Sequence, residues 1–297
     1  MRQDAYQEIT DRIIKLLEEG TVPWQKPWVT RERHPRNLVS GKKYRGINAF
    51  ILSNADYTSP YWLTYKQASD RGGHVRRGEK GFPCVYWNWT EIPDEKTGEM
   101  ELIPFLRKYT VFNVQQCENV PYLEIKANDK ECPPIEICEK IISGMPNPPS
   151  IEHGMAISAY YPSMDCVQMP FKNHFHNQES YYSSLFHELI HSTGHESRLA
   201  RPEVTNKTKF GSEKYGREEL AAEMGATYLC GHAGIENIVL DNSASYIDGW
   251  LGKLNDDRRL VVTAASQAQK AADYILRDSL NQYDQTATSE YNSSINT

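Results

Sequence analysis

The residues best suited to chemistry form the sequence HELIH at positions 187 to 191. His187 and His191 stand four apart, so on a helix both imidazoles project from one face and can bind one Zn²⁺ ion. Glu188 then lies beside the open coordination position, where its carboxylate can accept a proton from water and return it to a leaving amine. The motif predicts the site of a zinc-dependent metallopeptidase with Glu188 as the catalytic residue, and Mn²⁺ or another divalent metal as the alternative ion.

A site with two histidines needs a third protein ligand. One branch of zinc peptidases places a further histidine six residues after the second, but Ser197 holds that place here. A glutamate fits better, because the helical sequence REELAAEMGATYL follows, in which Glu219 is the expected ligand and Glu223 is expected to brace a ligating histidine. An exchange of these two roles stays open. His195 is an alternative ligand only if the first helix continues through Gly194, since glycine more often ends a helix.

Other elements must hold these residues in place. Apolar spacing predicts helices over 3–19, 47–55, 60–71, 134–143, 178–193, 214–230, 243–254 and 262–280. Aromatic and β-branched residues predict a hairpin from 82–92 and 102–114, and short strands at 155–161 and 165–170. The second of these strands is a candidate edge for an extended peptide substrate, and Tyr215 and Tyr246 are candidate donors to an oxyanion.

The expected fold class is α+β with two domains. A Pro-, Asn- and acid-rich stretch separates a small α+β domain at 1–125 from a mainly helical domain with a small sheet at 151–285. Residues 126–150 are the expected linker, and the polar residues 286–297 are expected to be disordered. No apolar run is long enough for a membrane span and no secretory signal is visible, so we expect a cytoplasmic protein without a membrane partner. Six scattered cysteines without a CxxC pair indicate reduced thiols.

Charge divides unevenly along the chain. Residues 1–90 hold 15 Lys and Arg against 9 Asp and Glu, whereas the whole chain carries a net charge of −6. The same segment contains five of the six tryptophans. Cations interleaved with aromatic rings are typical of grooves that bind single-stranded DNA, although the same rings are equally suited to forming the core of a small domain. The candidate DNA contacts are Trp24, Lys26, Trp28, Lys42, Lys43, Tyr44, Arg45, Arg76, Arg77 and Lys80.

With both regions in view, the chain resembles the ArdC antirestriction proteins of conjugative plasmids. The resemblance spans nearly all of residues 1–285 and depends on GTVPWQKPW, YRGIN, YWLTYKQA, GGHVRRGEKG, DCVQMP, HELIHSTGHESRL and YGREELAAEMGATYL. It implies a single-stranded-DNA-binding domain joined to a zincin-like metallopeptidase domain, in a plasmid-encoded bacterial protein that acts in the conjugation recipient. By position, the implied metal ligands are His187, His191 and Glu219, with Glu188 as the catalytic glutamate.

Two functions follow from these observations. The first is an antirestriction protein that protects incoming plasmid DNA by combining DNA binding with a metal-dependent peptidase, whose substrate or target is a protein of the host restriction system. The second is a non-proteolytic protector that coats the strand and uses its metal for structure or regulation. Glu188 separates the two, because a purely structural metal site does not need it.

Overall fold

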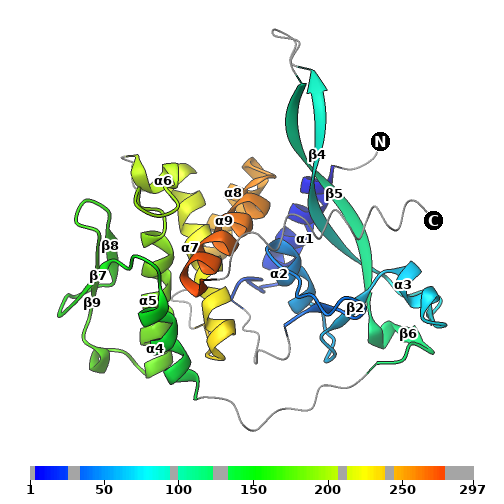
Figure 1. Cartoon of the computed structure of the whole chain (residues 1–297), viewed down its shortest axis with the longest axis horizontal. Helices are drawn as coiled ribbons and strands as arrows, with labels where there is room; N and C mark the ends of the chain where they lie inside the picture. The colour runs from blue at the N-terminus through cyan, green and yellow to red at the C-terminus, as the bar shows by residue number, and fades with distance from the viewer. Residues whose placement is uncertain are drawn as a thin grey trace.

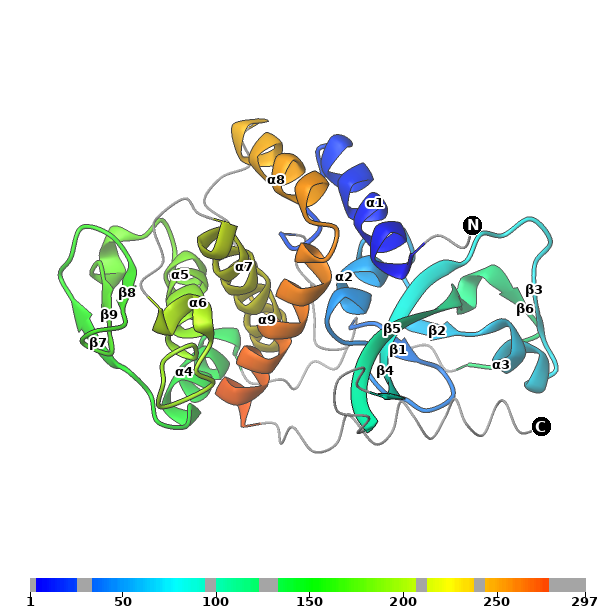
Figure 2. The ribbon, with the colours of Figure 1, turned by 90° about the horizontal axis from the view of Figure 1, so that it is seen from above.

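The computed structural model describes residues 4–25, 34–93, 100–122, 133–206, 213–237 and 244–277. We refer to residues 4–122 as the N-terminal part and to residues 133–277 as the C-terminal part. A group of helices occupies the middle of the molecule, with the smaller sheet of the C-terminal part at one end and the larger sheet of the N-terminal part at the other (Figures 1 and 2). The predicted α+β class is confirmed.

The N-terminal part begins with helix α1 (Ala5–Glu18). The side chain of Asp4 caps its first turn by accepting from the Tyr6 backbone N–H, and the chain leaves the last turn through Gly20 at a φ of +76°. Ile9 and Ile13 are buried on the inner face of α1, which contacts helices of the C-terminal part. The predicted amphipathic helix at 3–19 is confirmed.

A four-stranded sheet in the order β1-β2-β5-β4 forms the body of the N-terminal part. Its long antiparallel hairpin, in which Phe82 pairs with Val111, confirms the hairpin predicted from the sequence. The predicted helix at 60–71 is wrong in its first turn, because Thr64 forms a capping box with Gln67 and so starts the helix after a short strand. The elements are β1 (Arg36–Asn37), α2 (Ile47–Ser53), β2 (Tyr61–Leu63), α3 (Tyr65–Asp70), β3 (His74–Val75), β4 (Phe82–Pro93), β5 (Met100–Asn113) and β6 (Cys117–Glu118).

The C-terminal part is a helical layer with a three-stranded sheet beside it (Figure 2). The sheet has the order β7-β9-β8, so β9 is its central strand and is paired on both sides. The prediction that the strand at 165–170 is an edge is therefore wrong, and β7 and β8 are the two edge strands instead. The elements are α4 (Pro134–Gly144), β7 (Ser150–His153), β8 (Ala159–Tyr161), β9 (Cys166–Met169), α5 (Gln178–Ser192), α6 (Pro202–Thr205), α7 (Glu213–Ala233), α8 (Ala244–Asp256) and α9 (Leu260–Leu276).

One hydrophobic core runs through both parts. It includes Ile13 of α1, Phe50 of α2, Phe186 of α5 and Val261 of α9, each at most 1% exposed. Helix α4 lies within the predicted linker at 126–150, yet it packs on α5, α7 and α9. The predicted domain boundaries stay a prediction, and the predicted disordered tail lies outside the described residues. None of the described helices combines the length and apolar character that a membrane crossing requires.

Candidate functional site

Helix α5 positions both histidines of the HELIH motif. The side chain of Asn177 caps its first turn by accepting from the Ser180 N–H at 2.8 Å, and the helix continues to Ser192. The imidazoles of His187 and His191 lie one turn apart, with 3.1 Å between their Nε2 atoms. Glu188, between them in sequence, is 8% exposed and lines the same cleft.

Helix α7 crosses α5 and brings a carboxylate to the two imidazoles. One oxygen of Glu219 lies 3.1 Å from Nε2 of His187, and the other lies 3.7 Å from Nε2 of His191. Gly225 allows the close crossing, because a Cβ there would lie 2.7 Å from the side chain of Ile190 on α5. The three ligand atoms lie within 4.8 Å of one another, so two nitrogens and one oxygen converge as a divalent metal requires.

The charge around the imidazoles also favours a cation. Burial by itself lowers the pKa of His187, but the facing carboxylate of Glu219, aided by Glu188 and Glu223, raises this pKa to about 9. The carboxylates around His187 therefore favour a positive charge at this position. The donor set and its charge both fit a divalent ion.

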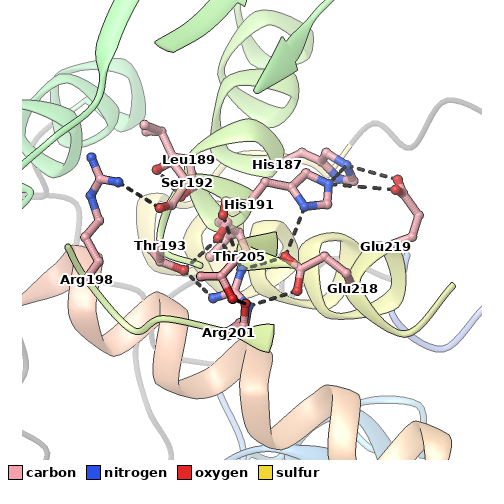
Figure 3. Close-up of polar contacts among 11 residues, drawn as sticks. His187, Leu189, His191, Ser192, Thr193, Arg198, Arg201, Thr205, Glu218 and Glu219 are labelled. Atoms are coloured by element: carbon pink, nitrogen blue, oxygen red, sulfur yellow. Dashed lines mark hydrogen bonds and ion pairs between the residues drawn. The ribbon is translucent and has the colours of Figure 1, made fainter. Parts of the chain in front are cut away.

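Glu218 holds the second histidine from behind. Its Oε1 atom lies 3.1 Å from Nδ1 of His191, which leaves Nε2 facing Glu219 (Figure 3). Arg201 in turn donates to both oxygens of Glu218, at 2.9 and 2.6 Å. Burial tends to raise the pKa of Glu218, but hydrogen bonds from Arg201 and His191 hold it below its usual value. The bracing role predicted for Glu223 therefore belongs to Glu218, which the sequence analysis missed.

Glu223 has different partners. Its Oε2 atom accepts from the indole N–H of Trp24 at 2.7 Å and from the hydroxyl of Tyr246 on α8. Burial raises the pKa of Glu223 to about 7. Within the described residues, the group of side chains able to hold a metal contains Glu219 and does not contain Glu223.

His195 lies in the turn that follows α5. Its Nδ1 atom is 2.8 Å from the hydroxyl of Ser197, and the helix has already ended at Ser192. The structure does not place His195 with His187 and His191, although it lines the same cleft.

A cleft of about 1190 Å³ surrounds these groups. Edge strand β8 and the loop before it line the cleft through residues 156–160. Helix α8 contributes Tyr246 to the lining, as the sequence analysis expected of an oxyanion donor, although its hydroxyl is engaged with Glu223. An extended polypeptide segment can therefore lie against a strand edge next to the histidines.

Several predicted DNA contacts face the interior instead. Trp24 is 0% exposed and belongs to the core, so its ring cannot stack on a base in this structure. Tyr44 is 8% exposed, and Arg45 forms an ion pair with the buried carboxylate of Asp273 on α9. These three predictions are corrected, because Trp24 and Tyr44 are buried in the core and the guanidinium of Arg45 is paired with Asp273.

The remaining predicted DNA contacts are exposed or lie outside the described residues. Lys26 and Trp28 fall outside them. Arg76 is exposed and paired with Glu79 at 2.6 Å. The exposed cations Lys42, Lys43, Arg77 and Lys80 stay candidates.

Three further rings of the N-terminal part, outside the candidate set, are exposed among the described residues. Tyr65 is 61% exposed at the start of α3, Trp87 is 39% exposed on β4, and Tyr122 is 37% exposed.

Comparisons with known proteins match the N-terminal part and the C-terminal part to two different families. Residues 3–112 match the family described as the N-terminal domain of anti-restriction factor ArdC, and residues 139–267 match the zincin-like metallopeptidase family. The metal-free crystal structure of the antirestriction protein ArdC from plasmid R388 is 39% identical, with a TM-score of 0.73, covering 93% of this chain and 97% of that one. The chain belongs to the ArdC antirestriction family.

Further relatives extend the comparison. The Mn(II)-bound structure of the same R388 protein is 37% identical with a TM-score of 0.73, covering 94% of this chain and 100% of that one. The protein y4eC of Sinorhizobium fredii is 33% identical over 92% of this chain and 91% of its own length. DNA primase TraC of Escherichia coli is 35% identical over 98% of this chain, which spans only 29% of that primase. The two-domain architecture predicted from the sequence is thus confirmed.

Proposed function

We propose that this ArdC family member protects incoming plasmid DNA from restriction by combining single-stranded-DNA binding with a metal-dependent peptidase centre. The observation that carries the peptidase proposal is the convergence of His187, His191 and Glu219, with Glu188 next to them in a cleft. We propose zinc as the resident ion and Mn²⁺ as the alternative, because imidazole and carboxylate ligands suit both.

His187, His191 and Glu219 would hold the ion. When bound, a divalent ion supplies a Lewis acid that polarises a carbonyl group and lowers the pKa of water. Glu218 fixes the ring of His191 by contacting Nδ1 at 3.1 Å, and Arg201 keeps Glu218 in place. The ligands are therefore supported before an ion arrives.

Glu188 is the proposed general base and acid. Its burial in the cleft, one residue after His187, suits a carboxylate that accepts a proton from the attacking water. The same carboxylate then delivers the proton to the amine that leaves. The substrate is proposed to be a polypeptide segment that pairs with the edge of β8, and a protein of the host restriction system is the proposed source.

The DNA strand is proposed to bind elsewhere. Among the residues that the structure describes, six glutamates line the cleft, namely Glu188, Glu196, Glu203, Glu218, Glu219 and Glu223. Their charge disfavours a phosphate backbone, whereas Arg77 and Lys80 are exposed on the N-terminal part. Two separate sites on one chain follow from this distribution of charge.

Glu188→Gln tests the peptidase proposal. We expect metal binding to persist and peptide hydrolysis to fall by about 10²- to 10⁴-fold, because the variant keeps the size of the side chain but cannot accept the proton. Glu196→Gln is the matched control, since Glu196 is an exposed member of the same cleft outside the ligand group. Unchanged hydrolysis in Glu188→Gln would refute the mechanism.

The same variant separates the second candidate function. If Glu188→Gln loses hydrolysis but still protects plasmid DNA in a restricting recipient, the protein acts as a non-proteolytic coat. If protection and hydrolysis are lost together, protection requires the peptidase.

The DNA proposal is tested with the double variant Arg77→Ala/Lys80→Ala in the full chain. We expect weaker binding to a single-stranded oligonucleotide and a salt slope smaller by about 0.7 for each phosphate that the variant no longer neutralises. Lys270→Ala, an exposed lysine of α9, is the control. Equal affinity for duplex DNA, or binding that does not respond to salt, would contradict a groove specific for single strands.

A further inference from the structure

Trp24 comes from the N-terminal part but lies inside the C-terminal part. Its carbonyl accepts a hydrogen bond from the hydroxyl of Thr227 on α7, and its ring meets Trp250 of α8 edge-on, with centroids 5.9 Å apart. The neighbouring carbonyl of Pro23 accepts from the side chain of Asn54 at 2.9 Å. Backbone and ring of Trp24 are thus fixed from several directions.

The indole N–H of Trp24 is directed at a carboxylate of the proposed metal centre. It donates to Glu223 at 2.7 Å, and Glu223 lies one turn after Glu219 on α7 and lines the cleft. Tyr246 donates to the same oxygen from α8. Glu223 is close enough to His187 and Glu219 for their charges to affect one another.

These contacts restrict where the Glu223 carboxylate can go. Held by Trp24 and Tyr246, it places a carboxyl group beside the ligands without taking the place of Glu219 between the imidazoles. A nearby cation favours the ionised form of this group, and in a buried site that charge attracts the cation more strongly than it would in water. Removal of the indole donor would leave a buried acceptor with one partner fewer and free to turn.

Building on the proposed metal centre, we infer that Trp24 is a positioning residue for that centre and acts through Glu223. The cleft then depends on the N-terminal segment packing against α7 and α8, where Trp24 contacts Glu223 from outside the cleft lining. Trp24 does not touch the ion or the substrate. It acts on the ion indirectly, through a hydrogen bond to a side chain near the ligands. Mutation of residues that act in this way typically changes metal affinity by about 10- to 100-fold.

Trp24→Phe tests this inference in the full chain, because phenylalanine keeps an aromatic ring but lacks the N–H. The measurement is the affinity for Mn²⁺ alone, at a temperature well below the unfolding temperature of every variant. We expect about 10-fold weaker binding. Trp62→Phe is the control for a purely structural effect. Trp62 is also a core tryptophan, 1% exposed, but it lies on β2 of the four-stranded sheet of the N-terminal part. It should bind Mn²⁺ within about twofold of the wild type.

A double-mutant cycle tests the route through Glu223. Glu223→Gln should weaken Mn²⁺ binding, and Trp24→Phe/Glu223→Gln should be no weaker than Glu223→Gln alone. Wild-type affinity in Trp24→Phe, or additive losses in the double variant, would overturn the inference. A wild-type chain that binds neither Mn²⁺ nor Zn²⁺ would instead overturn the proposed metal centre together with the inference, so the two failures are distinguishable.

Discussion

Replacing Arg201 with methionine is expected to destabilise the metal-free protein by roughly 3–5 kcal/mol. Removing one partner of a buried ion pair costs about this much, because the other charge is left without compensation. Arg201 is 6% exposed and Glu218 is 5% exposed. The guanidinium also donates to the Thr193 hydroxyl at 2.6 Å and to the Ile190 carbonyl at 2.8 Å, so two further acceptors lose a donor.

The chain contains a matched control for this prediction. Arg76 and Glu79 form an ion pair with the same 2.6 Å separation, but their side chains are 43% and 24% exposed. Water can solvate both groups when the pair is broken, so Arg76→Met should cost less than about 1 kcal/mol. The difference between the two variants measures the effect of burial together with the further hydrogen bonds that Arg201 donates.

The assay is urea unfolding of the full chain in excess chelator, with the free energy of unfolding extrapolated to water. The double variant Arg201→Met/Glu218→Gln should recover part of the stability, since it removes the buried charge that Arg201 had compensated. A destabilisation in Arg201→Met no larger than in Arg76→Met would refute the reasoning. So would a double variant less stable than Arg201→Met.

Three further predictions concern other parts of the molecule. Burial lowers the pKa of His34 to about 4. The stability that neutral His34 provides is therefore fully present above about pH 6.5 and is lost as the pH falls towards 4. In urea unfolding, His34→Gln should remove up to about 3 kcal/mol of this pH dependence of the free energy of unfolding. Arg45→Met should lower the free energy of unfolding by about 2 kcal/mol or more because it breaks an ion pair between the two parts, whereas Lys43→Met should change it by less than about 0.5 kcal/mol. Gly225→Ala should cost about 1–3 kcal/mol by forcing α7 away from α5, whereas Gly252→Ala, with open space around its new Cβ, should gain about 0.5–1 kcal/mol; thermal unfolding of both variants checks the contrast.

Local patterns were sufficient to predict most helices and the HELIH pair. The spacing of Ile9 and Ile13 predicts α1, and residues four apart on a helix necessarily share a face, which fixes His187 and His191 relative to each other. Strand β7 was missed because residues 150–153 are short and mostly exposed, without apolar alternation. Its parallel pairing makes β9 central, so the edge strand was misassigned.

The roles of the glutamates on α7 depend on information that a local pattern does not contain. Glu218, Glu219 and Glu223 all lie in the first half of the same helix, and any of them can face a histidine in principle. The crossing of α5 and α7 decides between them, and the contact of Gly225 with Ile190 sets how close that crossing is. Trp24 poses the same problem, since a ring in a basic segment can stack on a base or fill a core, and only packing distinguishes the two.

The division of charged and aromatic residues between the two parts limits where a DNA strand could bind. Trp24 and Arg45 face the C-terminal part, where they contact Glu223 and Asp273. Arg77 and Lys80 lie next to β3, which is at the opposite end of the molecule from strands β7, β8 and β9 (Figure 2). A DNA strand on those exposed cations would therefore occupy the end remote from the cleft, and the hydrophobic core that contains Trp24 joins the two ends.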